Sequence, residues 1–231
     1  NIDIYERYVQ IQTKSSIDAK TIKVLNPKEV VFEGGRELEL DAVSEVPRYY
    51  VCNAYGVCGI YSAPGTAVKE AYDTSGIVTN DRGVTVWLKG NRVSRNQIMA
   101  IKEESVTEQK NSLAVCLDNI LRHAGITRNT EYDLAQGKTA TTILSENMTG
   151  VQVLDLSGCT LDAVLYYVNQ DIPVLAILED GEAVLVTGFN EFNVVIMEPA
   201  TGKLYKKGMN DATAWFAENG NHFITYMRTE N

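Results

Sequence analysis

Residues Pro173 to Gly202 read PVLAILEDGEAVLVTGFNEFNVVIMEPATG. Two apolar runs flank an Asp180-Gly181 turn, and a third apolar run ends at Glu198-Pro199. Short apolar runs that are bounded by turn residues predict β-strands, and short connections between them indicate antiparallel neighbours. This stretch therefore predicts three consecutive strands of one sheet, at 174–178, 183–188 and 194–197.

Helices are predicted on both sides of these strands. From Leu113 onward, apolar residues recur at 113, 116, 117, 120, 121 and 124, which is the period of a one-sided helix that Gly125 closes. Ser105-Val-Thr-Glu108 upstream fits a capping box. Further helices are predicted at 130–135, 139–146, 160–170 and 211–218, and strands at 151–156 and 222–227. Helices followed by an antiparallel sheet are typical of the α+β class.

The N-terminal half is rich in predicted strands. Short strands are expected at 8–12, 21–25, 30–32 and 37–40, with turns at Asn26-Pro27 and Gly34-Gly35. A hairpin over 49–61, a helix over 64–72 closed by Gly76, and a hairpin of 77–79 with 84–88 then predict a ββαββ-type module. We expect two domains, a β-rich N-terminal part at 1–100 and a second domain at 101–231.

Composition limits the classes of partner. The chain has 231 residues with 45% hydrophobic and 22% charged residues, as in an ordinary globular protein. Its net charge of −9 argues against nucleic acid and favours a peptide or protein partner, in particular a basic one. No apolar run approaches the roughly 20 residues of a transmembrane helix, and no signal peptide is recognisable. Because the chain starts at Asn1 without methionine, we expect a mature or truncated fragment.

The four cysteines do not predict a disulfide framework or a metal site. Cys52, Cys58, Cys116 and Cys159 lack the spacing of zinc ligands, and we expect no cofactor and no metal. Cys52 and Cys58 flank a predicted turn, so they form either a disulfide across the hairpin or two independent strand thiols.

Five segments between about 105 and 227 carry a resemblance to a known family. They are SLAVCLDNILRHAGI, SGCTLDAVLYYVNQDIPVLAIL, GEAVLVTGF, VVIMEPATGKLY and NDATAWFAENGNHFITYM. In order and spacing they resemble the papain-like cysteine peptidases of the C39-like group. The resemblance implies a papain-like fold with a cysteine opening the central helix, a histidine after the turn glycine and an aspartate before the proline. Here these positions hold Ser112, Glu182 and Glu198.

These three replacements predict that the catalytic positions are degenerate. A carboxylate of pKa about 4.3 is a weak base toward a thiol of pKa about 8.5, a mismatch of roughly 5.7 kcal/mol. For a serine hydroxyl the mismatch is larger, and a serine or asparagine at a helix start is also a common cap.

Other assignments of the site stay open at this point. Cys116 with His123 or His222 is an alternative catalytic pair, although Cys116 lies on the apolar stripe and His123 is about 10.5 Å further along the helix axis. Gln109 is a candidate oxyanion donor. The pair Glu182 and Glu198 is a candidate for binding Ca²⁺ or for acid–base hydrolysis of another kind.

We therefore expect a catalytically inactive papain-like domain that acts as a binding or scaffolding unit. By the resemblance alone, it belongs to a bacterial protein that is extracytoplasmic or displayed at the cell surface, with the former substrate cleft as a peptide-binding site. The alternatives are an active cysteine hydrolase and a structural segment of a larger surface protein.

Overall fold

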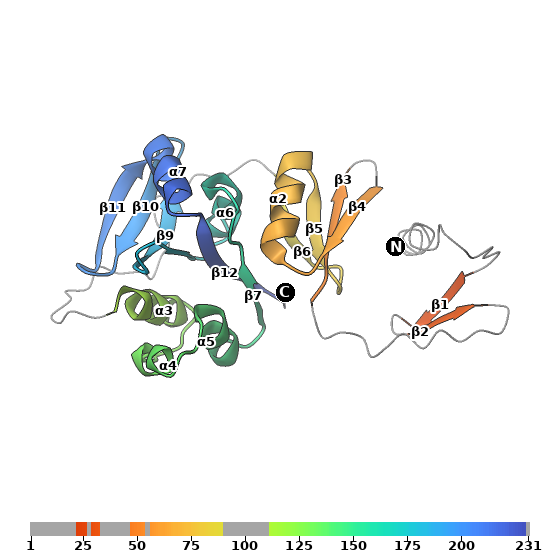
Figure 1. Ribbon diagram of the computed structural model, residues 1–231, viewed down its shortest axis with the longest axis horizontal. Helices are drawn as coiled ribbons and strands as arrows, with labels where there is room; N and C mark the ends of the chain where they lie inside the picture. The colour runs from red at the N-terminus through yellow and green to blue at the C-terminus, as the bar shows by residue number, and fades with distance from the viewer. Residues whose placement is uncertain (1–21, 27–28, 33–46, 54–55, 90–110, 230–231) are drawn as a thin grey trace.

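The described residues form three antiparallel sheets and a set of helices (Figure 1). The computed structural model describes residues 22–26, 29–32, 47–53, 56–89 and 111–229, without the side chains of residues 22–32, 57 and 58. Helices combined with antiparallel sheets confirm the predicted α+β class. The smallest sheet pairs β1 (Ile22–Asn26) with β2 (Glu29–Phe32), in agreement with two of the predicted N-terminal strands.

The six-stranded sheet is built from the C-terminal half of the chain. Its strands are β7 (Val151–Asp155), β8 (Val174–Ile177), β9 (Ala183–Phe189), β10 (Asn193–Glu198), β11 (Lys203–Gly208) and β12 (His222–Arg228). They lie in the order β11-β10-β9-β8-β12-β7, so β9 is an interior strand. Every residue of β9 is buried, which explains its nearly continuous apolar sequence.

In the part of the chain that the structure describes, five helices accompany this sheet (Figure 1). They are α3 (Ser112–His123), α4 (Glu131–Ala135), α5 (Ala140–Asn147), α6 (Leu161–Val168) and α7 (Met209–Glu218). Both α3 and α6 pack against β9 and β8. The apolar stripe predicted for α3 is its packing face, since Cys116, Leu117, Ile120 and Leu121 are all 0% exposed.

Capping residues set the helix boundaries close to the predicted ones. The Asn111 side chain accepts hydrogen bonds from the backbone N–H of Leu113 and Ala114 at the start of α3. Thr139 and Thr160 cap α5 and α6 in the same way. At the end of α3, Gly125 takes a φ of 84°, a conformation that favours glycine and closes the helix as expected.

The predicted ββαββ module is present. It consists of β3 (Tyr49–Asn53), β4 (Gly56–Tyr61), α2 (Pro64–Thr74), β5 (Ile77–Asn80) and β6 (Thr85–Leu88). The four strands form a separate sheet in the order β4-β3-β5-β6, and α2 packs on β3.

This module is joined to the C-terminal half by buried hydrogen bonds. The indole N–H of Trp87 donates to the carbonyl of Ala163 at 3.0 Å, and the hydroxyl of Tyr167 donates to the carbonyl of Val86 at 3.0 Å. Apolar side chains of both parts also belong to one continuous core. The two parts have separate sheets and a shared core, so the division at residue 100 stays a prediction.

Gly65 lies where the two parts come closest. A Cβ added at this position would lie 2.9 Å from the carbonyl oxygen of Ser157 and 3.2 Å from that of Asp155. The Cys159 thiol also donates to the carbonyl of Gly65 at 3.3 Å. The close approach of α2 to the end of β7 therefore requires a residue without a side chain.

Three features differ from the sequence-based predictions or lie beyond them. α2 continues to Thr74, and Ser75 rather than Gly76 takes the left-handed conformation, with a φ of 54°. β11 was not predicted, because its sequence KLYKKG lacks alternating apolar residues. Its lysines are typical of an edge strand that avoids pairing with other molecules.

Within the described part of the chain, no helix has the length and apolar composition needed to cross a bilayer.

Several predictions fall outside the described residues. They concern the strands at 8–12 and 37–40, the Gly34-Gly35 turn, the capping box at 105–108 and the candidate Gln109. The Cys58 side chain is not described either, so the Cys52–Cys58 disulfide stays a prediction. The backbone register pairs Cys52 with Val57, next to a bulge.

The Gly65 contact can be tested by substitution. Glycine to alanine within a helix usually stabilises a protein, but Gly65→Ala places a methyl group against two backbone carbonyls. We expect it to lower the free energy of unfolding by about 1–3 kcal/mol. Thr66→Ala, an exposed change in the same helix, is the control and should stay within about 0.5 kcal/mol. Equal urea-unfolding curves for the two variants would contradict the close contact.

Candidate functional site

Ser112, the residue at the nucleophile position of the resembled family, is the first residue of α3. Asn111 supplies the helix cap, so the Ser112 side chain is not needed for that role. Its Oγ accepts a hydrogen bond from the backbone N–H of Ala183 at 2.9 Å, and Ser112 is 8% exposed. The hydroxyl therefore fixes the start of α3 to the first residue of β9.

Glu182 is next to this contact. It follows the Asp180-Gly181 turn, where the Asp180 carboxylate accepts a hydrogen bond from the Glu182 N–H at 3.0 Å. Gly181 has a φ of 84°, as the tight turn between β8 and β9 requires. The Glu182 side chain is exposed. Burial raises the pKa of the Cys116 thiol in α3, and the charge of Glu182 raises it further.

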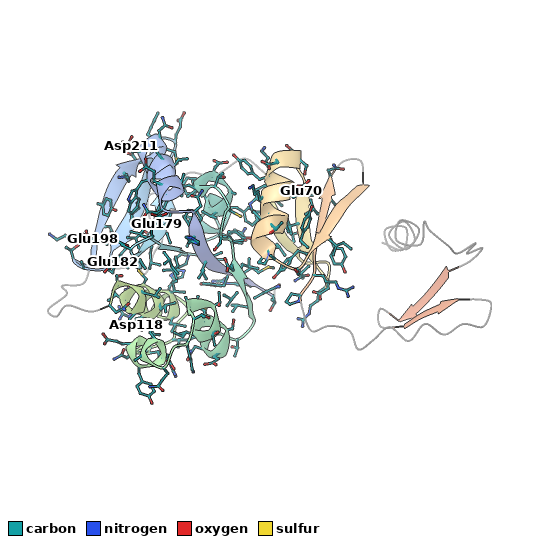
Figure 2. The ribbon with its side chains drawn as sticks, in the orientation of Figure 1. Glu70, Asp118, Glu179, Glu182, Glu198 and Asp211 are labelled. Carbon is teal, nitrogen blue, oxygen red and sulfur yellow. The ribbon has the colours of Figure 1, made fainter. Side chains whose placement is uncertain are left out.

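Glu198 is the last residue of β10 and lies at the same end of the sheet's strands as Glu182. β9 and β10 are antiparallel neighbours, with Met197 opposite Leu185, so the end of β10 lies beside the start of β9. Figure 2 shows Glu182 and Glu198 at these strand ends, beside the start of α3. The exposed Glu198 carboxylate accepts a hydrogen bond from the Thr201 hydroxyl at 2.8 Å.

The structure thus brings Ser112, Glu182 and Glu198 to one end of β9 and β10. The arrangement contains a hydroxyl that already accepts a backbone hydrogen bond and two exposed carboxylates. It contains no imidazole that could take a proton from the hydroxyl at neutral pH.

Cys116 is unsuited to a catalytic role in this structure. Its side chain is 0% exposed, and burial, followed by the negative charge of Glu182, raises the pKa of the thiol well above its ordinary value. A reactive cysteine needs a thiolate and access to its substrate. Here the raised pKa opposes formation of the thiolate, and burial denies a substrate access to the thiol.

The two histidine rings lie against residues other than Cys116. The His123 Nε2 lies 2.6 Å from the carbonyl oxygen of Asp171, at the far end of α3 from Ser112. The exposed His222 ring lies against Gly220, since a Cβ added there would be 2.8 Å from the His222 Nε2. Among the described hydrogen bonds, none joins either histidine to Cys116. The alternative pairing of Cys116 with a histidine stays a prediction that this geometry does not support.

The two glutamates do not form part of a larger ligand set in the described residues. No group of three or more His, Cys, Asp or Glu side chains there is placed to hold a metal ion. Within the described residues, the structure places no further metal ligand beside Glu182 and Glu198. It therefore does not strengthen the hypothesis of Ca²⁺ binding or that of acid–base hydrolysis.

Sequence reasoning located the three positions but missed the contact that joins them. The Ser112–Ala183 hydrogen bond connects residues 71 positions apart, between a side chain and a backbone amide. Only the resemblance placed both segments near one another, because no periodicity or spacing within the chain encodes such a bond.

Comparisons with known proteins add a likeness in fold only. No protein-family model matches the chain, and no curated protein matches it. A crystal structure from Bacillus anthracis, described as a "putative C39-like peptidase", matches with a TM-score of 0.48 and 12% sequence identity. The match covers 59% of this chain and 100% of that chain. A likeness of this degree carries no argument about the site, so membership of the C39-like group stays an expectation from the sequence.

The structural role of the Ser112 hydroxyl predicts a loss of stability on its removal. Ser112→Ala leaves the buried N–H of Ala183 without an acceptor, which should cost about 1–3 kcal/mol in the free energy of unfolding. Ser145→Ala, at an exposed position of α5, is the matched control and should change little. If urea unfolding shows Ser112→Ala to be as stable as the control, the hydroxyl does not hold α3 to β9.

The buried thiols are expected to be unreactive in the folded protein. Burial, with a smaller contribution from the charge of Asp155, raises the pKa of Cys159 to about 12. Relative to an ordinary thiol, the thiolate fraction at pH 8 falls about 1000-fold. Iodoacetamide at pH 8 should therefore modify Cys116 and Cys159 only after denaturation, as read by peptide mass spectrometry. Rapid labelling of native Cys116 would instead favour the cysteine-hydrolase alternative.

Proposed function

We propose that the C-terminal half of this chain is a catalytically inactive papain-like domain that binds a peptide segment as a scaffolding unit. The observation that carries the proposal is the hydrogen bond from the Ala183 N–H to the Ser112 hydroxyl. At the position where the resembled peptidases need a free thiolate, this chain has a buried hydroxyl that helps to hold helix and sheet together.

The charge of the site supports a basic or extended peptide as the partner. Glu182 and Glu198 are exposed where β9 begins and β10 ends, beside the start of α3, in a chain of net charge −9. Exposed carboxylates attract cationic groups and repel anionic ones. A bacterial, extracytoplasmic setting, as the sequence resemblance implies, belongs to this proposal.

Restoring the family residues provides the test. In a variant with Ser112→Cys and Glu182→His, we expect an imidazole beside a thiol at a helix start. The pH midpoint for alkylation of the residue 112 thiol should then fall by about one unit or more relative to Ser112→Cys alone. The control variant combines Ser112→Cys with Glu191→His, in the exposed turn between β9 and β10.

The unmodified protein is tested in parallel for activity. Incubated with a mixture of synthetic peptides, it should yield no cleavage product by mass spectrometry. Cleavage by the native chain would refute the proposal of an inactive domain. An alkylation midpoint in the restored variant equal to that of the Glu191→His control would show that positions 112 and 182 are not a former catalytic pair.

A further inference from the structure

A hollow of about 440 Å³ opens at one end of the six-stranded sheet. Its lining includes Asp155, Ser157, Ile177, Glu179, His222 and Ile224. These residues come from the end of β7 and the turn after it, the end of β8 and the turn after it, and the start of β12. The volume lies within the range of sites that hold small ligands or single side chains.

The hollow lies close to the Ser112 contact. Ala183 of β9 is opposite Ile177 of β8, and Ile177 is opposite His222 of β12. Since neighbouring strands are about 4.8 Å apart, Ala183 and His222 are separated by about 10 Å, the length of three extended residues. A peptide that crosses the strand ends beside Ser112 would therefore reach the hollow within a few residues.

Two carboxylates give the hollow a negative charge. The Asp155 Oδ1 accepts hydrogen bonds from the Ser157 N–H at 2.9 Å and from its hydroxyl at 2.6 Å, which fixes the carboxylate. Glu179 is exposed on the β8–β9 turn (Figure 2). The lining contains no lysine or arginine, and no ion pair of either carboxylate is found within the described residues.

Apolar side chains also line the hollow. Ile224 is 8% exposed, and Ile177 is half-buried, so both present hydrocarbon surface to the hollow beside the carboxylates. A long basic side chain matches this combination, because its methylene stem packs on apolar surface while its charged end reaches a carboxylate. The two carboxylates would repel an anionic ligand, and a wholly apolar ligand would bring no cation to either of them.

We propose that this hollow binds a lysine or arginine side chain of an extended peptide that lies across the strand ends beside Ser112. The inference rests on the peptide-binding function proposed above and names the side chain that the partner must carry. Two carboxylates alone would accept any cation. The concave, partly apolar surface beside them selects a basic side chain with a long stem.

The test measures binding of acetylated pentapeptides to the full chain by isothermal titration and amide NMR shifts. One peptide has arginine at its centre and alanine elsewhere, and a second has norleucine, which keeps the stem without the charge. The arginine peptide should bind and shift the amide signals of His222 and Ile224. Asp155→Asn with Glu179→Gln should weaken its binding about tenfold or more. The affinity of the unmodified chain for the norleucine peptide should be no higher than the affinity of that double variant for the arginine peptide.

A matched control separates local from overall charge. Glu191→Gln with Glu218→Gln removes the same net charge at exposed positions outside the hollow and should leave binding unchanged. Equal weakening by both double variants, or equal binding of the norleucine peptide, would overturn the inference. Butylammonium that binds as tightly as the arginine peptide would show a free-amine site instead. Cleavage of the peptide would refute the proposed function separately from the hollow.

Discussion

The hydrogen bond from the Ala183 N–H to the Ser112 hydroxyl joins the first residue of the central helix to the first residue of the interior strand β9. A buried backbone N–H needs an acceptor, and at this place the acceptor is a side chain rather than a neighbouring strand. The bond therefore sets how α3 meets the sheet. It also occupies the one side-chain oxygen that stands where the resembled peptidases have a nucleophile.

The electrostatics around this bond are consistent with a binding surface. Glu182 and Glu198 are exposed near the start of α3, where the positive end of a helix dipole favours negative charge. Inside the same helix, burial keeps the Cys116 thiol protonated. The arrangement offers carboxylates to solvent, which suits recognition of a cationic group better than proton transfer.

The sequence predicted the elements whose patterns are strong and local. The apolar stripe of α3, the threonine caps of α5 and α6 and the Asp180-Gly181 turn all depend on residues close in the chain. β11 was missed because an edge strand needs no alternating apolar residues. The Ser112–Ala183 bond and the hollow at the ends of β7, β8 and β12 depend on residues that only the folded chain brings together.

The most direct test of this account is native-state hydrogen exchange at the amide of Ala183. If the Ser112 hydroxyl accepts this N–H in a buried contact, the amide should exchange as slowly as those of the β9 interior, and Ser112→Ala should accelerate it selectively. Exchange at Ala183 in the unmodified protein as fast as at the neighbouring turn residue Gly181 would mean that the hydroxyl is free, and the account would be wrong.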